Sequence, residues 1–224
     1  MIPHLRAKGH EVWTPTLSGA GERHHLLTRE TSLSTHIQDI VNVLRYEELH
    51  NVILVGHSYA GVVITGVADQ ARGRISALVY LDATLPENGQ NASGQFPDPN
   101  ASSESVAFGL PEDQWLLPAP PPQVMGVHDA DDLKWVSDKR VAHPMRALLE
   151  PLRLAHGEPT QIPRTYIRCS QNEAMVKFFG GNPLEASQQK AKRDGLVMRE
   201  LDTGHDAMIT KPHELSELLL EAAS

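Results

Sequence analysis

NVILVGHSYAGVVITG, residues 51–66, is the stretch of sequence that decides the fold. Residues 52–55 form an unbroken apolar run rich in β-branched side chains, which predicts a strand buried on both faces of a parallel sheet. The turn Gly-His-Ser-Tyr-Ala-Gly, residues 56–61, follows; it is close to the Gly-x-Ser-x-Gly pattern but has alanine at residue 60 and glycine at residue 61. A second apolar run from residue 62 predicts a helix. Strand, turn and helix in this order indicate a nucleophile elbow, which holds Ser58 in a strained conformation at the N-terminus of the helix.

The composition limits the class of protein and its partners. A chain of 224 residues can form one α/β domain, and a net charge of −8 argues against a nucleic-acid partner. Cys169 is the only cysteine, so no intrachain disulfide can form and nothing indicates an oxidising compartment. The first residues contain no apolar block of signal-peptide or membrane-spanning length. We therefore expect a cytoplasmic protein without a membrane partner.

The rest of the chain alternates predicted helices and strands, which is typical of a parallel sheet. We expect helices over residues 2–8, from residue 34, over 183–194 and from residue 212, and strands over residues 11–14, 75–81, 164–169 and 196–201. Ligand sites in such sheets lie at the carboxyl ends of the strands, where Ser58 and Asp82 both fall.

Residues 86–160 contain most of the prolines and a helical patch around residues 133–154. We interpret them as a cap inserted into a core formed by residues 1–85 and 161–224. Three apolar side chains in the cap are candidate walls of a substrate pocket, namely Trp115, Leu116 and Trp135. The alternative is that they pack the cap onto the core.

His205 lies just after the last predicted strand and before the final helix. A histidine at this place, far along the chain from Ser58, suits a general base, and the order serine, acid, histidine is kept. His57 is adjacent to Ser58, but successive side chains diverge. We therefore expect His57 to be structural.

Five segments together resemble the α/β-hydrolase superfamily, and more narrowly the bacterial esterases related to plant methylesterases and hydroxynitrile lyases. They are PTLSGAGERHHL, GHSYAG, LVYLDATLPE, WLLPAPPP and TGHDAM, and the resemblance extends over essentially the whole chain. It implies an α/β-hydrolase fold, with a mostly parallel sheet, helices on both faces and a helical, proline-rich cap. It matches Ser58 to the nucleophile, His205 to the base and the N–H of Tyr59 to an oxyanion-hole donor, and it implies no cofactor or metal.

The acid of the triad departs from the family pattern. The plant relatives carry it shortly after the strand that matches RTYIRC, where this chain has Asn172 and Glu173. An amide can orient an imidazole but cannot stabilise an imidazolium by its charge. Asp82 is therefore the preferred acid, since some members of the superfamily take the acid from that strand, and Asn172 and Glu173 are the alternatives.

Members of the family normally begin with a strand that ends in His-Gly and leads to the second oxyanion-hole N–H. In the resemblance, this strand lies between EVWTP and NVILVG, and the sequence starts after it. Three explanations would account for the absence of this strand from the sequence: upstream residues have been lost, the start codon has been placed late, or the fold tolerates the missing strand. Because losing one oxyanion donor costs roughly a hundred- to a thousandfold in rate, we expect weak or no activity.

The predicted function is hydrolysis of a small apolar or aromatic carboxylic ester through an acyl-enzyme intermediate. The expected partner is a small-molecule ester, and the sequence leaves open whether the chain forms a homodimer. One alternative is a degenerate hydrolase that binds small molecules without turning them over. Another is a hydroxynitrile lyase, which would need a lysine directly after the base, where this chain has Asp206.

Overall fold

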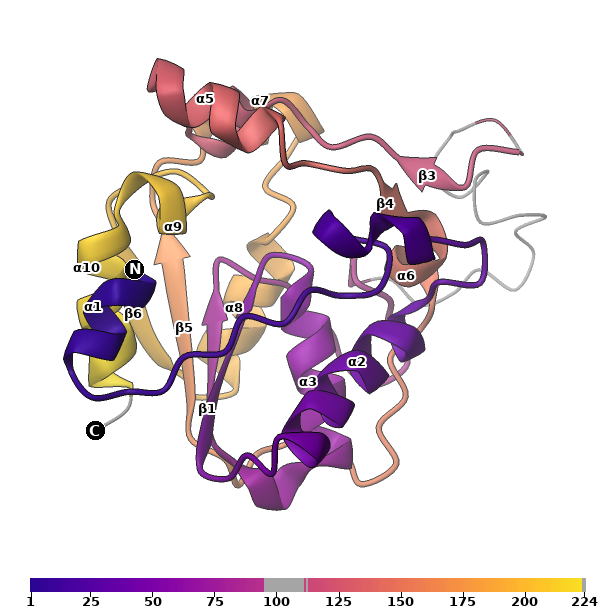
Figure 1. Cartoon of the computed structure of the whole chain (residues 1–224), viewed down its shortest axis with the longest axis vertical. Helices are drawn as coiled ribbons and strands as arrows, with labels where there is room; N and C mark the ends of the chain where they lie inside the picture. The colour runs from indigo at the N-terminus through magenta and orange to yellow at the C-terminus, as the bar shows by residue number, and fades with distance from the viewer. Residues whose placement is uncertain (95–110, 112, 223–224) are drawn as a thin grey trace.

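Four parallel strands form the central sheet of the computed structural model, which describes residues 1–94, 111 and 113–222 (Figure 1). The strands are β1 (Val52–His57), β2 (Ile75–Leu81), β5 (Arg164–Cys169) and β6 (Val197–Leu201). Their order in the sheet is β1-β2-β5-β6, and every neighbouring pair is parallel. The strands predicted from residues 75 and 164 have the bounds expected from the sequence.

Helices and two very short strands complete the described part of the chain. The helices are α1 (Ile2–Ala7), η1 (Gly21–Leu26), α2 (Leu33–Tyr46), α3 (Ala60–Gln70), η2 (Arg72–Arg74), η3 (Pro122–Met125), α5 (Ala130–Ser137), α6 (Met145–Leu149), α7 (Glu173–Phe179), α8 (Glu185–Arg193), α9 (Ala207–Thr210) and α10 (Pro212–Glu221). The short strands β3 (Leu116–Leu117) and β4 (His143–Pro144) pair antiparallel.

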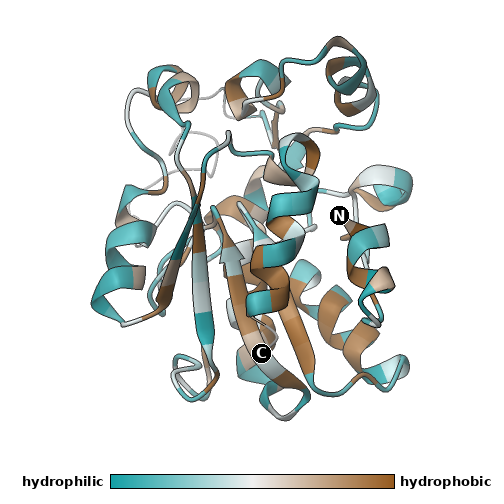
Figure 2. Ribbon diagram, turned by 90° about the vertical axis from the view of Figure 1, so that its left-hand side faces the viewer, coloured by the Kyte–Doolittle hydropathy of each residue, from teal (hydrophilic) through white to brown (hydrophobic). Residues whose placement is uncertain are grey.

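Helices cover both faces of the sheet, as predicted, because side chains alternate along β2. Leu78 and Tyr80 point into a core shared with α2 and α3, whereas Val79 and Leu81 point into a second core closed by α10. Apolar strands consequently lie in the interior, and hydrophilic helix surfaces lie outside (Figure 2). The predicted fold class, a mostly parallel sheet between two layers of helices, is confirmed.

β1 is less buried than the sequence suggested. Val55 is 39% exposed, and the three residues before it, 52–54, are half-buried. The expectation of burial on both faces is wrong for this strand because β1 ends the sheet and has a neighbour on one side alone in the described structure. β2, with a strand on each side, is buried along almost its whole length.

The predicted strand over residues 11–14 is also wrong. Glu11–Thr14 is irregular backbone, because no described strand is available beside β1 for it to pair with. The local pattern of alternating side chains suits a strand, but a strand needs a hydrogen-bonded neighbour. The helix predicted from residue 34 is confirmed; it begins at Leu33, and Ser32 caps it by accepting a hydrogen bond from the Thr35 N–H.

The segment predicted to be a cap contains β3, η3, α5, β4 and α6. Figure 1 places α5 and β3 beyond the carboxyl ends of the strands, the side on which ligand sites occur in parallel sheets. Residues 95–110 and 112 of this segment lie outside the described residues, so the division into core and cap stays a prediction. No helix in the described ranges is both long enough and apolar enough to cross a bilayer.

Candidate active site

Ser58 lies in a sharp turn between β1 and α3. Its φ of 54° is in the left-handed region, which residues with a side chain rarely adopt. Backbone hydrogen bonds hold the turn on both sides: the Ser58 N–H donates to the Leu81 carbonyl at 3.2 Å, and the Thr84 N–H donates to the Ser58 carbonyl at 3.0 Å. The turn therefore has the strained geometry of a nucleophile elbow.

Two glycines make this turn possible. A Cβ atom at Gly56 would lie 2.6 Å from the Ala60 carbonyl oxygen, and one at Gly61 would overlap the Thr84 carbonyl oxygen. Both obstacles are backbone atoms, which cannot rotate away. Side chains at these two positions would therefore collide with the backbone.

His205 and Asp82 form a buried pair at the carboxyl ends of β6 and β2. His205 Nδ1 lies 2.7 Å from Asp82 Oδ2, and the two side chains are 7% and 1% exposed. The other carboxylate oxygen, Oδ1, accepts a hydrogen bond from the Cys169 N–H at 3.2 Å. Because a carboxylate accepts, His205 donates from Nδ1, which leaves its Nε2 free to take a proton.

The two alternative acids lie elsewhere. Asn172 is the N-cap residue of α7 and Glu173 is exposed at the start of that helix. Neither makes a hydrogen bond to His205, whose carboxylate partner is Asp82. The geometry therefore favours Asp82 over both.

His57 ties the elbow to the loop that carries His205. Its Nε2 donates to the His205 carbonyl oxygen at 2.9 Å, and the two imidazole rings are 4.4 Å apart. Burial, together with the charge of His205, lowers the pKa of His57 to about 3, so His57 is neutral near pH 7. The structural role expected for His57 agrees with this contact. Ser58 Oγ and His205 Nε2 are not themselves hydrogen-bonded.

A cavity of about 220 Å³ opens beside Ser58. Its walls come from the loop before η1, from the elbow and from residues 141–144 of the predicted cap. The three cap side chains predicted as pocket walls are not among them. Trp115 packs under the Arg29 guanidinium and Leu116 pairs with Pro144, whereas Trp135 lines a second cavity of about 260 Å³.

Two histidines of the first cavity were not singled out by the sequence. His36 in α2 bonds through Nδ1 to the Tyr59 hydroxyl at 2.9 Å and through Nε2 to the Ser18 carbonyl at 3.0 Å. His143 in β4 packs its ring 4.5 Å from the Tyr59 ring. No sequence signal could have found His143, because a two-residue strand has no periodicity to detect.

Ligand atoms of His57, His205 and Asp206 lie within 4.8 Å of one another, a grouping that could hold a metal ion. Hydrogen bonds already occupy Nε2 of His57 and Nδ1 of His205. Burial raises the pKa of the Asp206 carboxyl, which disfavours its charged form. These contacts give the three residues a structural explanation that needs no metal.

The elbow, the sheet and the histidine after the last strand match a known family. The profile of the alpha/beta hydrolase family fits residues 2–218. The chain belongs to the alpha/beta hydrolase family. Because the match covers almost the whole sequence, the family resemblance inferred from the five segments is confirmed.

This hydrolase has relatives with esterase names. The carbendazim hydrolyzing esterase of Nocardioides sp. (strain SG-4G) is 36% identical over 227 residues, which cover 96% of this hydrolase and 89% of the relative. Methylesterase 10 of Arabidopsis thaliana is 25% identical over 239 residues, with 98% and 84% covered.

Solved structures of the family are also similar to this hydrolase. An extracellular alpha/beta-hydrolase from a Paenibacillus species has a TM-score of 0.74 and 25% identity, with 98% of this chain and 90% of that chain covered. A methylesterase from Arabidopsis has a TM-score of 0.72 and 22% identity, with 99% and 90% covered. The second likeness supports the fold alone.

Proposed function

We propose that this hydrolase is a serine esterase that cleaves a small carboxylic ester through an acyl-enzyme intermediate. The observation that carries the proposal is the buried pair of His205 and Asp82 at the edge of the sheet where the elbow presents Ser58. The names of its relatives, an esterase that hydrolyses carbendazim and a plant methylesterase, support the same reaction class.

In this mechanism, the Asp82 carboxylate fixes the tautomer of His205 with the proton on Nδ1. His205 Nε2 takes the Ser58 proton as the hydroxyl attacks the ester carbonyl, and His205 then returns the proton to the leaving alcohol. Water, activated by the same nitrogen, releases the acid. The bond between Ser58 and His205 would form as substrate binds, since such bonds are often long in free enzymes.

The N–H of Tyr59 is the oxyanion donor that we assign. It has no acceptor among the described residues, and it lies at the start of α3, where the helix dipole favours negative charge. A donor of this kind normally contributes roughly a hundred- to a thousandfold in rate.

The cavity beside Ser58 supports a small substrate. A volume of about 220 Å³ suits one compact group of an ester, and its walls include Leu17, Ala60 and Val141. An apolar or aromatic ester would find few charges there.

The test is turnover of p-nitrophenyl acetate and of carbendazim by the chain and by its Ser58→Ala variant. Hydrolysis that disappears in the variant supports the esterase. A fluorophosphonate probe separates slow catalysis from none: covalent labelling at Ser58 is expected. A folded chain that the probe does not label would instead support a small-molecule binder that performs no chemistry.

The binder is the second candidate because Ser58 and His205 are not hydrogen-bonded in the structure. A hydroxynitrile lyase is not proposed: the residue after His205 is Asp206, an acid where that reaction would need a lysine to bind cyanide.

A further inference from the structure

Most polar atoms around the cavity beside Ser58 already have partners. His36 donates from Nε2 to the Ser18 carbonyl, because a carbonyl can act only as the acceptor. Burial lowers the pKa of His36, which keeps the ring neutral, so its Nδ1 accepts the Tyr59 O–H. His57 similarly uses Nε2 on the His205 carbonyl.

His143 differs from these neighbours. Neither of its ring nitrogens makes a hydrogen bond to a described residue, although the ring packs against Tyr59 and lies 5.9 Å from the ring of His36. Its Nε2 is fully buried without a partner, and His143 is one of the residues that line the cavity. A buried polar atom without a partner is costly, so its presence calls for an explanation.

The surroundings of His143 hold it in place. β4 pairs with β3, so that His143 lies opposite Leu117, and Pro144 restricts the backbone after it. Burial, with a contribution from His36, lowers the pKa of His143 to about 4. The imidazole is therefore neutral near pH 7 and carries one donor and one acceptor nitrogen.

We infer that His143 is a specificity-determining residue that hydrogen-bonds to a polar group of the ester bound beside Ser58. The preferred substrate class is then a small ester that carries a hydroxyl, amino or amide group, rather than one built of hydrocarbon alone. This inference rests on the proposed esterase function.

The experiment compares ester pairs that differ by a methyl and a hydroxyl group of similar size. p-Nitrophenyl butyrate and p-nitrophenyl 3-hydroxypropionate vary the acyl side, and propyl acetate and 2-hydroxyethyl acetate vary the alcohol side. A hydroxyl both donates and accepts, so it suits either tautomer of His143. We expect His143→Phe to lower the ratio of kcat/KM for the hydroxylated ester over its partner by about tenfold in one pair.

Two further variants make the test specific. His143→Gln keeps a donor and an acceptor and should retain most of the ratio, and Val141→Ala changes the cavity wall without a polar group and should leave the ratio as in the parent. Thermal unfolding checks that each variant folds. The same ratio in the parent, His143→Phe and His143→Gln would overturn the inference.

Failure of the proposed function would look different. If the parent chain hydrolyses none of the four esters, calorimetric binding of the acyl pair to the Ser58→Ala chain still tests His143. A preference for the hydroxylated ester that His143→Phe abolishes would keep the inference without the esterase. Equal binding of both esters by the Ser58→Ala chain would overturn it.

Discussion

Ser58 and Asp82 share an unusual backbone conformation. Their φ angles are 54° and 40°, and only two other non-glycine residues in the described part of the chain have a positive φ. Such conformations cost of order 1–3 kcal/mol each and persist only where the surrounding structure enforces them. Both residues follow a strand directly, and each donates its N–H to the next strand, Ser58 to Leu81 and Asp82 to Ile167. The sheet thus fixes the side chains of Ser58 and Asp82 at the carboxyl ends of neighbouring strands.

Replacement of Asp82 tests the choice of acid. We expect Asp82→Asn to lower kcat for p-nitrophenyl acetate by about 10⁴-fold, because the amide favours the wrong tautomer of His205. Asn172→Ala and Glu173→Gln are the matched controls and should change kcat by less than about threefold. A large loss in either control, with Asp82→Asn active, would move the acid to the loop after β5.

Ser58, Asp82 and His205 were candidates from the sequence because each lies next to a strand that its own pattern reveals. The alternatives Asn172 and Glu173 were equally near a strand end; charge disfavoured the Asn172 amide, but the distance from His205 to Asp82 was needed to favour Asp82 over Glu173. The cavity walls were harder to predict. His143 is 85 residues from Ser58 along the chain, and nothing in its local sequence indicates that it faces the site.

The elbow as an element depends on its glycines. Gly61→Ala should destabilise the fold by about 2 kcal/mol or more, because the new methyl group would overlap the Thr84 carbonyl. Gly73→Ala is the control: a Cβ there meets no atom within 4 Å. That change should be neutral or stabilise the protein by up to about 1 kcal/mol, since it restricts the unfolded chain. Urea unfolding of both variants provides the comparison, and equal stabilities would contradict it.

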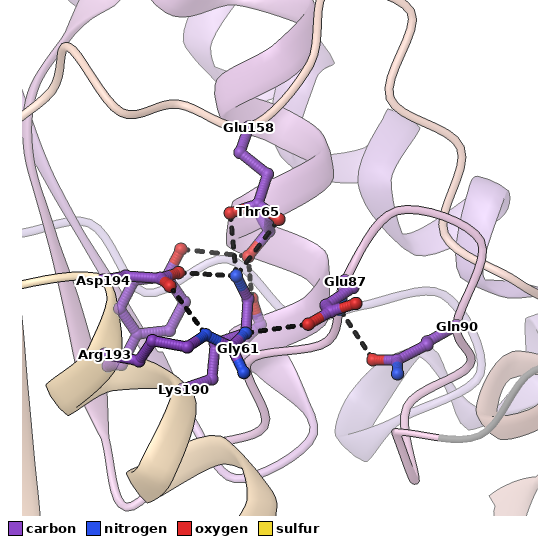
Figure 3. Close-up of polar contacts among 9 residues, drawn as sticks. Gly61, Thr65, Glu87, Gln90, Glu158, Lys190, Arg193 and Asp194 are labelled. Carbon is purple, nitrogen blue, oxygen red and sulfur yellow. Dashed lines mark hydrogen bonds and ion pairs between the residues drawn. The ribbon is translucent and has the colours of Figure 1, made fainter.

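α8 fastens both ends of the predicted cap to the core (Figure 3). Lys190 Nζ lies 2.8 Å from Glu158 Oε2 and also contacts Asp194, and its side chain is 7% exposed. On the same helix, Arg193 reaches Glu87 at 2.8 Å. Glu87 lies just after the start of the cap and Glu158 just before its end, so one helix holds both connections.

Removal of the buried cation should be costly. Lys190→Met leaves two partly buried carboxylates without their partner, and we expect the free energy of unfolding to fall by about 3 kcal/mol. Lys192→Met, an exposed position on the same helix, should change it by less than about 0.5 kcal/mol. Chemical denaturation measures both. A loss in Lys190→Met no larger than in Lys192→Met would show that the network contributes little.

Among helices and strands, the sequence predicted best those whose pattern depends on their own residues and not on a neighbour far along the chain. The α2 helix and strands β2 and β5 were found because periodicity and β-branched runs act locally. The expected strand at Glu11–Thr14 failed because pairing depends on a neighbour that no local pattern shows. The ion pair between Lys190 and Glu158 joins residues that are 32 positions apart, so no local pattern could predict it either.

At the scale of the whole molecule, three neutral histidines lie near the site in the described structure: His36, which is buried, and His57 and His143, which are half-buried. Burial lowers the pKa of each below the usual 6.5, to about 3 for His57 and about 4 for His143. The unfolded chain therefore binds more protons than the folded chain between these values and pH 6.5. The contribution of these histidines to the free energy of unfolding is fully present above about pH 6.5 and is lost as the pH falls toward their pKa values in the folded chain.

The contribution of His143 to this pH dependence can be measured separately. His143→Gln should reduce the slope of unfolding free energy against pH, between pH 6 and 4.5, by about 1 kcal/mol per pH unit, close to the limit for one proton. His128→Gln, an exposed position in the loop before α5, is the control and should leave the slope unchanged. Denaturant unfolding at several pH values gives both slopes. Parallel curves for His143→Gln and the parent would refute a neutral imidazole at residue 143.

In the described structure β1 has a neighbouring strand on one side alone, so the turn that holds Ser58 follows an outermost strand of the sheet. Amide protons on the unpaired side of β1 should exchange with deuterated solvent faster than those of β2. Local opening of β1 would move Ser58, because Ser58 directly follows this strand. A short β-forming peptide that pairs with this side of β1 would add a strand to the sheet, and its binding would also make the turn that holds Ser58 more rigid.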